Sequence, residues 1–239
     1  RKKQSGKAAS QRIKSEAETR YLIDEQLRKV GWEADTELLR YSMGTRPAKG
    51  RNIAIAEWPT DSTVGNRGYV DYALFIGMQL VSTVEAKAIH KDIPSVIDYQ
   101  CKDYSRNIRS VDKVYQIDTW GGYGVPFTFA TNGRPYLKQY DTKSGIWFLD
   151  LRQPDNAPKA LQGWMSPEGI EELLDKDISA RNQDLREMSY DLLRDKDGLG
   201  LYEYQLRAIK AAEEAIINGQ RNALLAMATG TGKTRTILG

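Results

Sequence analysis

Three charged residues stand in the stretch 68–87, which otherwise has the composition of buried strands. Two runs rich in β-branched and aromatic residues flank the pair Gly77–Met78, a pattern typical of two antiparallel strands joined by a tight turn. Asp71 lies among apolar neighbours in the first run, and Glu85 and Lys87 lie two residues apart in the second. Because side chains alternate along a strand, we expect Glu85 and Lys87 on one face.

These three residue types indicate metal-assisted hydrolysis of a phosphodiester. An ionised carboxylate among apolar residues is unfavourable unless its charge is compensated, and a divalent metal ion held by Asp71 and Glu85 would compensate both acids. Mg²⁺ suits such a site because it is commonly held by one or two carboxylates together with substrate phosphate. Lys87 would then stabilise charge that develops on the phosphate or orient the attacking water. The alternative is a surface hairpin with one cross-strand Glu–Lys pair.

A helix is expected soon after this hairpin, from about Ser95 to Ile108, with Pro94 in its first turn. Gln100 and Tyr104 are four residues apart and share one face of that helix. The order Asp, Glu-x-Lys and Gln-x-x-x-Tyr resembles a sub-class of the PD-(D/E)xK nucleases. The resemblance implies that Gln100 and Tyr104 lie beside the metal site and help to hold DNA. An ordinary Gln–Tyr contact is the alternative.

Glu18 is a further catalytic candidate, because nucleases of this kind often bring an acid from the first helix towards the active centre. A helical pattern runs from about Ser10 to Val30, and its other acids are expected to form a solvated face. Three basic residues on or just beyond the later helix would contact DNA phosphates, unless they too form a solvated face: Lys102, Arg106 and Arg109.

Residues 15–150 are predicted to form one α/β domain, a PD-(D/E)xK nuclease-like mixed sheet flanked by helices. Further strands are expected at 32–39, 52–58, 125–131, 134–140 and 145–150, with a hairpin turn at 131–134. Residues 1–14 hold six basic residues and no acid. We interpret them as a flexible basic arm, which is either a terminus of no function or a DNA-contacting arm. Residues 151–197 are predicted to be a linker with helices.

A second motif, Ala-Thr-Gly-Thr-Gly-Lys-Thr, occupies residues 228–234. It follows an expected helix at 202–219 and an expected short strand at 222–227, and it has the form of a phosphate-binding loop. Glycines let backbone N–H groups surround a phosphate, the lysine reaches the β- and γ-phosphates, and the last threonine ligates Mg²⁺. A glycine turn without a ligand is the alternative. The motif predicts ATP contacts from six residues: Thr229, Gly230, Thr231, Gly232, Lys233 and Thr234.

Gln205 lies on the helix that precedes this loop. Superfamily 2 helicases place a glutamine there to read the adenine edge, and Tyr-Gln-x-x-Ala-Ile resembles that motif, with a surface glutamine as the alternative. Met227 stands where the general loop pattern has its first glycine, as in the helicase version. Residues 198–239 are therefore predicted to begin a RecA-like superfamily 2 helicase domain. No Walker B strand follows the loop in this sequence. We therefore expect no ATP hydrolysis from residues 1–239, and expect it only from a longer protein that contains the full motor domain.

Composition excludes several classes of protein. No apolar run approaches the roughly 20 residues that a membrane-spanning helix needs, so we expect no membrane partner. Cys101 is the single cysteine, which excludes an internal disulfide and fits a reducing cytoplasm. With His90 as the single histidine, a Cys/His zinc site and a His-based triad are also excluded. Net charge is only +3, so a nucleic acid would have to be bound through local basic patches.

The nuclease residues followed by a helicase motor resemble the restriction (R, HsdR-type) subunit of type I restriction-modification enzymes. Further similar stretches are Glu16-Ala-Glu-Thr-Arg, Phe129-Ala-Thr-Asn-Gly-Arg and Met227-Ala-Thr-Gly-Thr-Gly-Lys-Thr. The chain lacks an initiator Met and ends within a motif, so we expect an N-terminal fragment of such a subunit.

The resemblance implies a cytoplasmic type I site-specific deoxyribonuclease that requires Mg²⁺ and ATP. It also implies double-stranded DNA, a specificity subunit and a methyltransferase subunit as partners. Such a subunit translocates DNA and then cuts both strands. Two alternatives stay open, namely a nuclease–helicase of DNA repair and a non-catalytic DNA-clamping domain attached to a motor.

Overall fold

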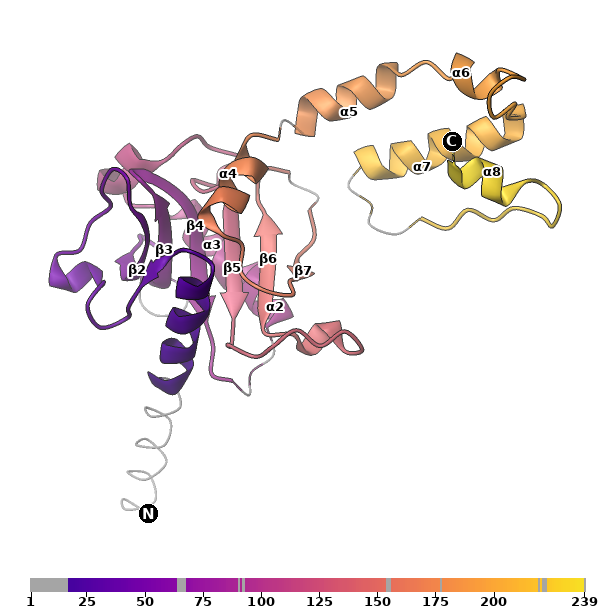
Figure 1. The fold of residues 1–239 in the computed structure, drawn as a ribbon. Coiled ribbons are helices and arrows are strands. Elements are labelled where there is room, and N and C mark those ends of the chain that lie inside the picture. The colour runs from indigo at the N-terminus through magenta and orange to yellow at the C-terminus, as the bar shows by residue number, and fades with distance from the viewer. Residues whose placement is uncertain are drawn as a thin grey trace. The chain divides into compact units, whose positions relative to one another are not determined.

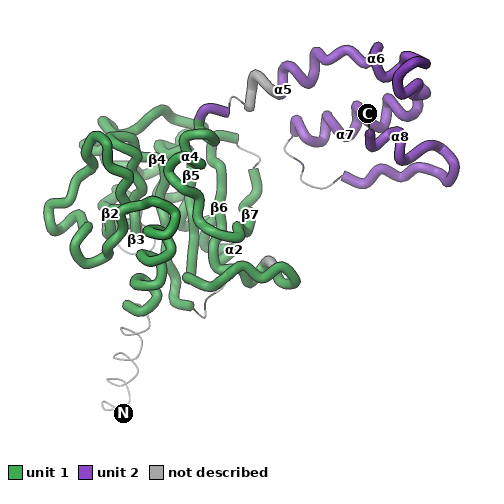
Figure 2. The backbone as a smooth tube through the Cα atoms, viewed as in Figure 1, with its two compact units in different colours: residues 1–174 green, residues 175–239 purple. Residues whose placement is uncertain are grey.

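The computed structural model describes residues 17–63, 68–89, 91, 93–153, 156–176, 178–218, 220 and 223–238. The chain divides into two compact units, residues 1–174 and 175–239 (Figure 2). The predicted basic arm at residues 1–14 lies outside the described residues, as does His90. No helix in the described part is both long enough and apolar enough to cross a membrane.

Unit 1 is built on one mixed sheet of seven strands whose order in space follows their order in the chain. The pairs β1–β2 and β4–β5 are parallel and the other neighbours are antiparallel. The mixed α/β fold expected from the sequence is therefore confirmed. The strands are β1 (Glu33–Ala34), β2 (Asn52–Pro59), β3 (Tyr69–Ile76), β4 (Gln79–Ala86), β5 (Phe127–Thr131), β6 (Ile146–Asp150) and β7 (Lys159–Ala160).

The expected hairpin at 68–87 forms as β3 and β4, with the turn at Gly77 and Met78. Gly77 has a φ of 56°, a left-handed conformation that a glycine adopts without steric conflict. Tyr72 pairs with Val84, and the register shifts once between Leu74 and Phe75. These two strands lie at the centre of the sheet, between β2 and β5.

Helices cover both faces of the sheet (Figure 1). A helix at residues 17–29 and α4 (Pro167–Leu174) pack on one face, where Ile23, Leu27 and Ile170 join a buried apolar cluster. On the other face, a helical segment after β4 contributes Ile97, Cys101 and Tyr104 to a second cluster. Alternate residues of the central strands supply the two clusters, as expected of a sheet that is buried on both sides.

The helix expected at 95–108 forms, but it is not uniform. It consists of α2 (Pro94–Val96), a π-helical turn η2 (Ile97–Cys101) and α3 (Lys102–Arg106). Single π-helical turns are often found at functional sites, because they shift the direction of neighbouring side chains. Short 3₁₀ turns complete unit 1: η1 (Tyr41–Met43), η3 (Ser110–Tyr115) and η4 (Asp141–Lys143).

The strand and hairpin turn expected at 131–140 are wrong, because β5 pairs directly with β6 and residues 134–140 form an irregular connection. Side chains take up its backbone donors: Asn132 accepts from the N–H of Arg134 at 3.1 Å, and Ser144 accepts from the N–H of Leu137 at 2.9 Å. Pro135 lacks an N–H altogether. The segment therefore has few donors left for a strand ladder.

Residues 151–174 belong to unit 1, although the sequence predicted a linker from residue 151. β7 extends the sheet beside β6. Trp164 is buried, and its indole N–H donates to Gln26 Oε1 at 3.1 Å. Trp32 in turn donates to the carbonyl of Met165 at 2.9 Å. The Pro- and Gly-rich composition concealed these buried residues.

Unit 2 consists of helices in the described residues. They are α5 (Ile178–Glu187), α6 (Asp191–Arg194), α7 (Glu203–Ile217) and α8 (Lys233–Leu238). Leu201, Leu206 and Ile209 form its small core. The strand expected at 222–227 is absent from residues 223–228. A strand needs a neighbour for its backbone hydrogen bonds, and the described part of unit 2 offers it none.

Candidate active site

The hairpin places Asp71 and Glu85 opposite each other where the ladder between β3 and β4 ends. Tyr72 pairs with Val84, so one step further along the antiparallel ladder Asp71 faces Glu85. Here the backbone N–H of Ala86 donates to Asp71 Oδ2 at 2.7 Å, and the carboxylate replaces a strand carbonyl as acceptor. Both acids are buried, with 4% of Asp71 and 1% of Glu85 exposed.

Lys87 lies at the rim of this acid pair. Its ammonium forms an ion pair with Glu85 Oε1, and its side chain is 24% exposed whereas that of Glu85 is fully buried. Its backbone N–H donates to the carbonyl of Thr131 at 2.7 Å, which fixes the end of β4 against β5. The ammonium therefore contacts the buried acid on one side and reaches solvent on the other, where it can meet an incoming phosphate.

The backbone is irregular at Asp71 on β3 and at Glu57, the residue that faces it on β2. The register of β2 and β3 places these two acids opposite each other. Glu57 has a φ of 51°, which is uncommon for any residue except glycine. In a regular strand, residues three positions apart face opposite sides of the sheet. Here Ile55 and Trp58 of β2 contribute to the same core cluster, and so do Val70 and Ala73 of β3. Irregularities of this kind re-aim side chains beside active sites.

Burial raises the pKa of both carboxyls. The pKa of Glu85 rises to about 8 because of its burial and then the charge of Asp71, with Lys87 acting in the opposite direction. Burial also raises the pKa of Asp71, whereas Arg20 and the N–H of Ala86 lower it. Near neutral pH and without a bound cation, the two acids are therefore expected to share one proton.

The acid pair fits a hard divalent cation. No N–H or hydroxyl group in the described part of the chain donates to the buried Glu85 Oε2, so apart from the proton shared with Asp71 one carboxylate oxygen remains for a ligand. No group of three or more His, Cys, Asp or Glu side chains suited to a metal ion occurs among the described residues. Two carboxylates with open positions match Mg²⁺, which retains waters and binds substrate phosphate, better than Zn²⁺ or Ca²⁺, which take more protein ligands.

Gln100 and Tyr104 come from the helical segment that packs against β4 and β5. Gln100 lies in the π-helical turn and is partly exposed, whereas Tyr104 is fully buried in the core. Cys101 lies between these two residues in the sequence. Its pKa is raised by burial and then by the charge of Glu85, so this part of the helical segment lies near the acid pair. The DNA-holding roles of Gln100 and Tyr104 stay predictions, and Tyr104 packs in the core.

The helix at residues 17–29 brings the guanidinium of Arg20 to the site. Arg20 Nη2 donates to Asp71 Oδ1 at 2.7 Å, and Nη1 donates to Glu57 Oε1 at 3.4 Å. Glu18, two positions earlier, is exposed, and its catalytic role stays a prediction. Sequence reasoning missed Arg20 and Glu57. The signal for Glu57 was available, because it is an acid within an apolar strand, like Asp71.

The phosphate-loop motif of unit 2 turns at Gly230 and Gly232, which have φ values of 80° and 76°. Lys233 is the first residue of α8. Gln205 is buried, and its Nε2 donates to the carbonyls of Thr231 and Gly232 at 3.1 and 3.2 Å. The structure thus brings the predicted glutamine to the predicted loop. Thr229 and Thr234 lie in the same turn and helix start.

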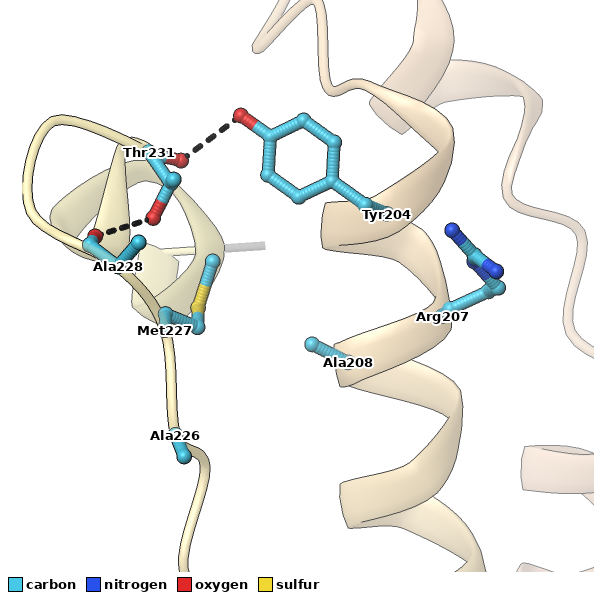
Figure 3. Close-up of a pocket in the computed structure, with 7 residues that line it drawn as sticks. All are labelled: Tyr204, Arg207, Ala208, Ala226, Met227, Ala228 and Thr231. Carbon is cyan, nitrogen blue, oxygen red and sulfur yellow. Dashed lines mark hydrogen bonds between the residues drawn. The ribbon is translucent and has the colours of Figure 1, made fainter.

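A pocket of about 420 Å³ lies between α7 and the loop (Figure 3). The hydroxyl of Tyr204 donates to the carbonyl of Thr231 at 3.0 Å, and Thr231 Oγ1 donates to the carbonyl of Ala228 at 2.7 Å. The first bond ties the loop to α7 on one side of the pocket, and the second closes the turn within the loop. The lining is Tyr204, Arg207, Ala208, Ala226, Met227, Ala228 and Thr231.

Comparison with known proteins agrees with this division of the chain. Residues 33–174 match the family model described as "Type I restriction enzyme EcoKI endonuclease subunit second domain". Residues 198–239 match the model described as "Type III restriction enzyme, res subunit". No solved structure matches the chain.

Two curated relatives from Escherichia coli are similar to the chain. The type I restriction enzyme EcoKI endonuclease subunit of strain K12 is 42% identical over 94% of this chain and 21% of its own length. The EcoAI endonuclease subunit is 35% identical over 47% of this chain and 13% of its own length. The chain thus spans about a fifth of the EcoKI subunit. The family match covers more than half of the residues, and the chain belongs to the endonuclease subunits of type I restriction enzymes.

Proposed function

We propose that unit 1 is a PD-(D/E)xK nuclease domain that cuts both strands of unmodified DNA in the presence of Mg²⁺. The observation that supports this most directly is the buried pair of Asp71 and Glu85, which leaves Glu85 Oε2 without an N–H or hydroxyl donor from the described residues. Two buried carboxylates this close repel each other even with Arg20 and Lys87 beside them, and a nuclease has a use for the divalent cation that would relieve this repulsion.

Each residue of the site has a distinct task in this mechanism. Asp71 and Glu85 would hold Mg²⁺, and when bound the ion supplies Lewis-acid chemistry by polarising the scissile phosphate and favouring deprotonation of an attacking water. Lys87 meets the phosphate at the rim, where its charge stabilises negative charge that develops on the non-bridging oxygens. The N–H of Ala86 fixes the orientation of Asp71, and Arg20 occupies its other oxygen in this structure. The buried floor of the site excludes bulk water and strengthens these electrostatic interactions.

We further propose that unit 2 begins the ATP-driven motor of a DNA-translocating subunit. The loop at residues 228–234 would hold the ATP phosphates, and Gln205 would read the adenine edge. Specificity and methyltransferase subunits would be partners of the complete subunit in the cytoplasm. These proposals are supported by the match of residues 198–239 to a restriction-enzyme res subunit and by relatives described as endonuclease subunits.

Calorimetric titration of the full chain with Mn²⁺ tests the metal site. Wild-type protein is expected to bind the ion, and Asp71→Asn and Glu85→Gln are expected to weaken binding by at least about tenfold, because each removes one charged ligand. Glu33→Gln is a matched control, since Glu33 is exposed and pairs with Arg51 away from the acid pair. Equal binding by all four proteins would argue for a DNA-clamping domain without catalysis.

A further inference from the structure

We propose that Arg20 is a positioning residue that competes with the divalent cation for Asp71 and moves to Glu57 when the cation binds. This inference rests on the proposed function, because it assumes that Asp71 is a metal ligand. It assigns to the first helix of unit 1 a role in setting the metal affinity of the site.

Both oxygens of Asp71 are engaged in this structure. Oδ1 accepts from Arg20 Nη2 at 2.7 Å and Oδ2 accepts from the backbone N–H of Ala86 at 2.7 Å. The second bond belongs to β4 and cannot move without disturbing the sheet. The guanidinium, by contrast, is at the end of a flexible side chain that is 24% exposed. A cation that approaches Oδ1 would therefore displace Arg20.

Arg20 has a second carboxylate within reach. Its Nη1 lies 3.4 Å from Glu57 Oε1, and Glu57 stands opposite Asp71 across β2 and β3. Glu57 is more exposed than Asp71, with 35% of its side chain accessible against 4%. A small rotation of the guanidinium would thus exchange a buried partner for a solvated one and keep its charge compensated.

The backbone at Glu57 favours this arrangement. Its φ of 51° is a strained conformation that persists only where the surrounding structure imposes it, and such positions cluster at functional sites. Arg40 Nη1 lies 3.3 Å from Glu57 Oε2 and holds the carboxylate from the other side. Glu57 is therefore fixed between two arginines, with Oε1 directed towards Arg20.

Electrostatics gives the direction of the effect. A guanidinium and a divalent cation on one carboxylate repel each other, and at short separations near a protein surface this repulsion is large even after partial screening by solvent. Wild-type metal affinity is therefore lower than that of the same acid pair without Arg20. A residue that merely orients Asp71 would have the opposite effect, because its removal would loosen a ligand.

The test is calorimetric titration of the full chain with Mn²⁺. Arg20→Gln is expected to bind the ion at least about tenfold more tightly than wild type, as removal of a repelling unit charge predicts. Arg40→Gln is the matched control: it contacts the same Glu57 but lies on no oxygen of Asp71, and affinity is expected within about twofold of wild type. Unchanged or weaker binding by Arg20→Gln would overturn the proposal.

Arg20→Lys keeps the test decisive if the glutamine variant does not fold. An ammonium on a shorter stem cannot bridge Asp71 and Glu57 as the planar guanidinium does, so binding is expected between those of wild type and Arg20→Gln, and equal or weaker binding than wild type overturns the proposal. Absence of Mn²⁺ binding to wild-type protein would overturn both this inference and the proposed function. Binding that depends on Asp71 but not on Arg20 would overturn this inference alone.

Discussion

Replacing Glu85 by glutamine is expected to remove a strong pH dependence from the stability of the metal-free protein. Burial and the charge of Asp71 raise the pKa of Glu85 from 4.5 to about 8. Between these values the folded state holds a proton that the unfolded state has released. The stability contributed by that proton is fully present below pH 4.5 and is lost as the pH rises through about 8.

The size of this effect follows from the same two values. A pKa that rises from 4.5 to about 8 corresponds to about 5 kcal/mol of unfolding free energy. No discount for solvent applies, because the side chain of Glu85 is fully buried. Glutamine has nearly the same shape and does not titrate. Wild type loses this stability as the pH rises and the glutamine variant does not. The unfolding free energy of Glu85→Gln minus that of wild type should therefore rise by about 5 kcal/mol from pH 4.5 to above pH 8.

Urea unfolding in the presence of EDTA measures this difference. All five tryptophans lie within residues 1–174, so tryptophan fluorescence reports on unit 1 alone. Glu37→Gln serves as the control, since Glu37 is exposed and its replacement should leave the pH profile of wild type unchanged. A difference between wild type and Glu85→Gln that varies by less than about 1 kcal/mol across this pH range would refute the reasoning.

Three further predictions follow from the site and the fold. Asp71→Ala or Lys87→Ala in the complete restriction complex should abolish double-strand cleavage and leave ATP-driven translocation intact; cleavage assays beside a translocation assay check this, and retained cutting by either variant counts against the assignment. Trp164→Ala should destabilise unit 1 by about 3–5 kcal/mol in urea unfolding, as expected for a buried tryptophan, whereas a residue of a linker would have little effect. Gly145→Ala should strongly destabilise unit 1, because its Cβ would lie 2.0 Å from the carbonyl oxygen of Arg134 and the backbone there would have to shift; urea unfolding of the purified variant checks this, and an unchanged midpoint counts against it.

The sequence predicted the centre of the fold well because local signals and tertiary structure agree there. The hairpin at 68–87 has strand formers on both sides of a glycine turn, and it forms with the expected acids at its open end. The connection at 131–145 was mispredicted because Asn132 and Ser144 bind backbone N–H groups that a strand would need. Such competition between side chain and backbone depends on three-dimensional contacts.

The site was predictable only in part for a related reason. Asp71 and Glu85 stood out because a charge in an apolar strand requires compensation. Arg20 did not stand out, because an arginine on an amphipathic helix is usually solvated, and only the packing of that helix on the sheet brings it to Asp71. The left-handed φ of Glu57 likewise arises from the sheet and has no local sequence signal such as glycine.

Asp71 has a structural task as well as its proposed chemical one, and this affects how its variants are interpreted. Its Oδ2 takes the N–H of Ala86 where the β3–β4 ladder ends. Alanine at position 71 would leave that N–H without its acceptor, at about 1–3 kcal/mol if water does not replace it. Asparagine keeps an oxygen for that N–H, removes the charge, and replaces the oxygen that accepts from Arg20 with an NH2 group. Loss of metal binding in Asp71→Asn therefore reports on the charge and on that second oxygen with the sheet hydrogen bond retained, whereas loss in Asp71→Ala includes damage to the sheet.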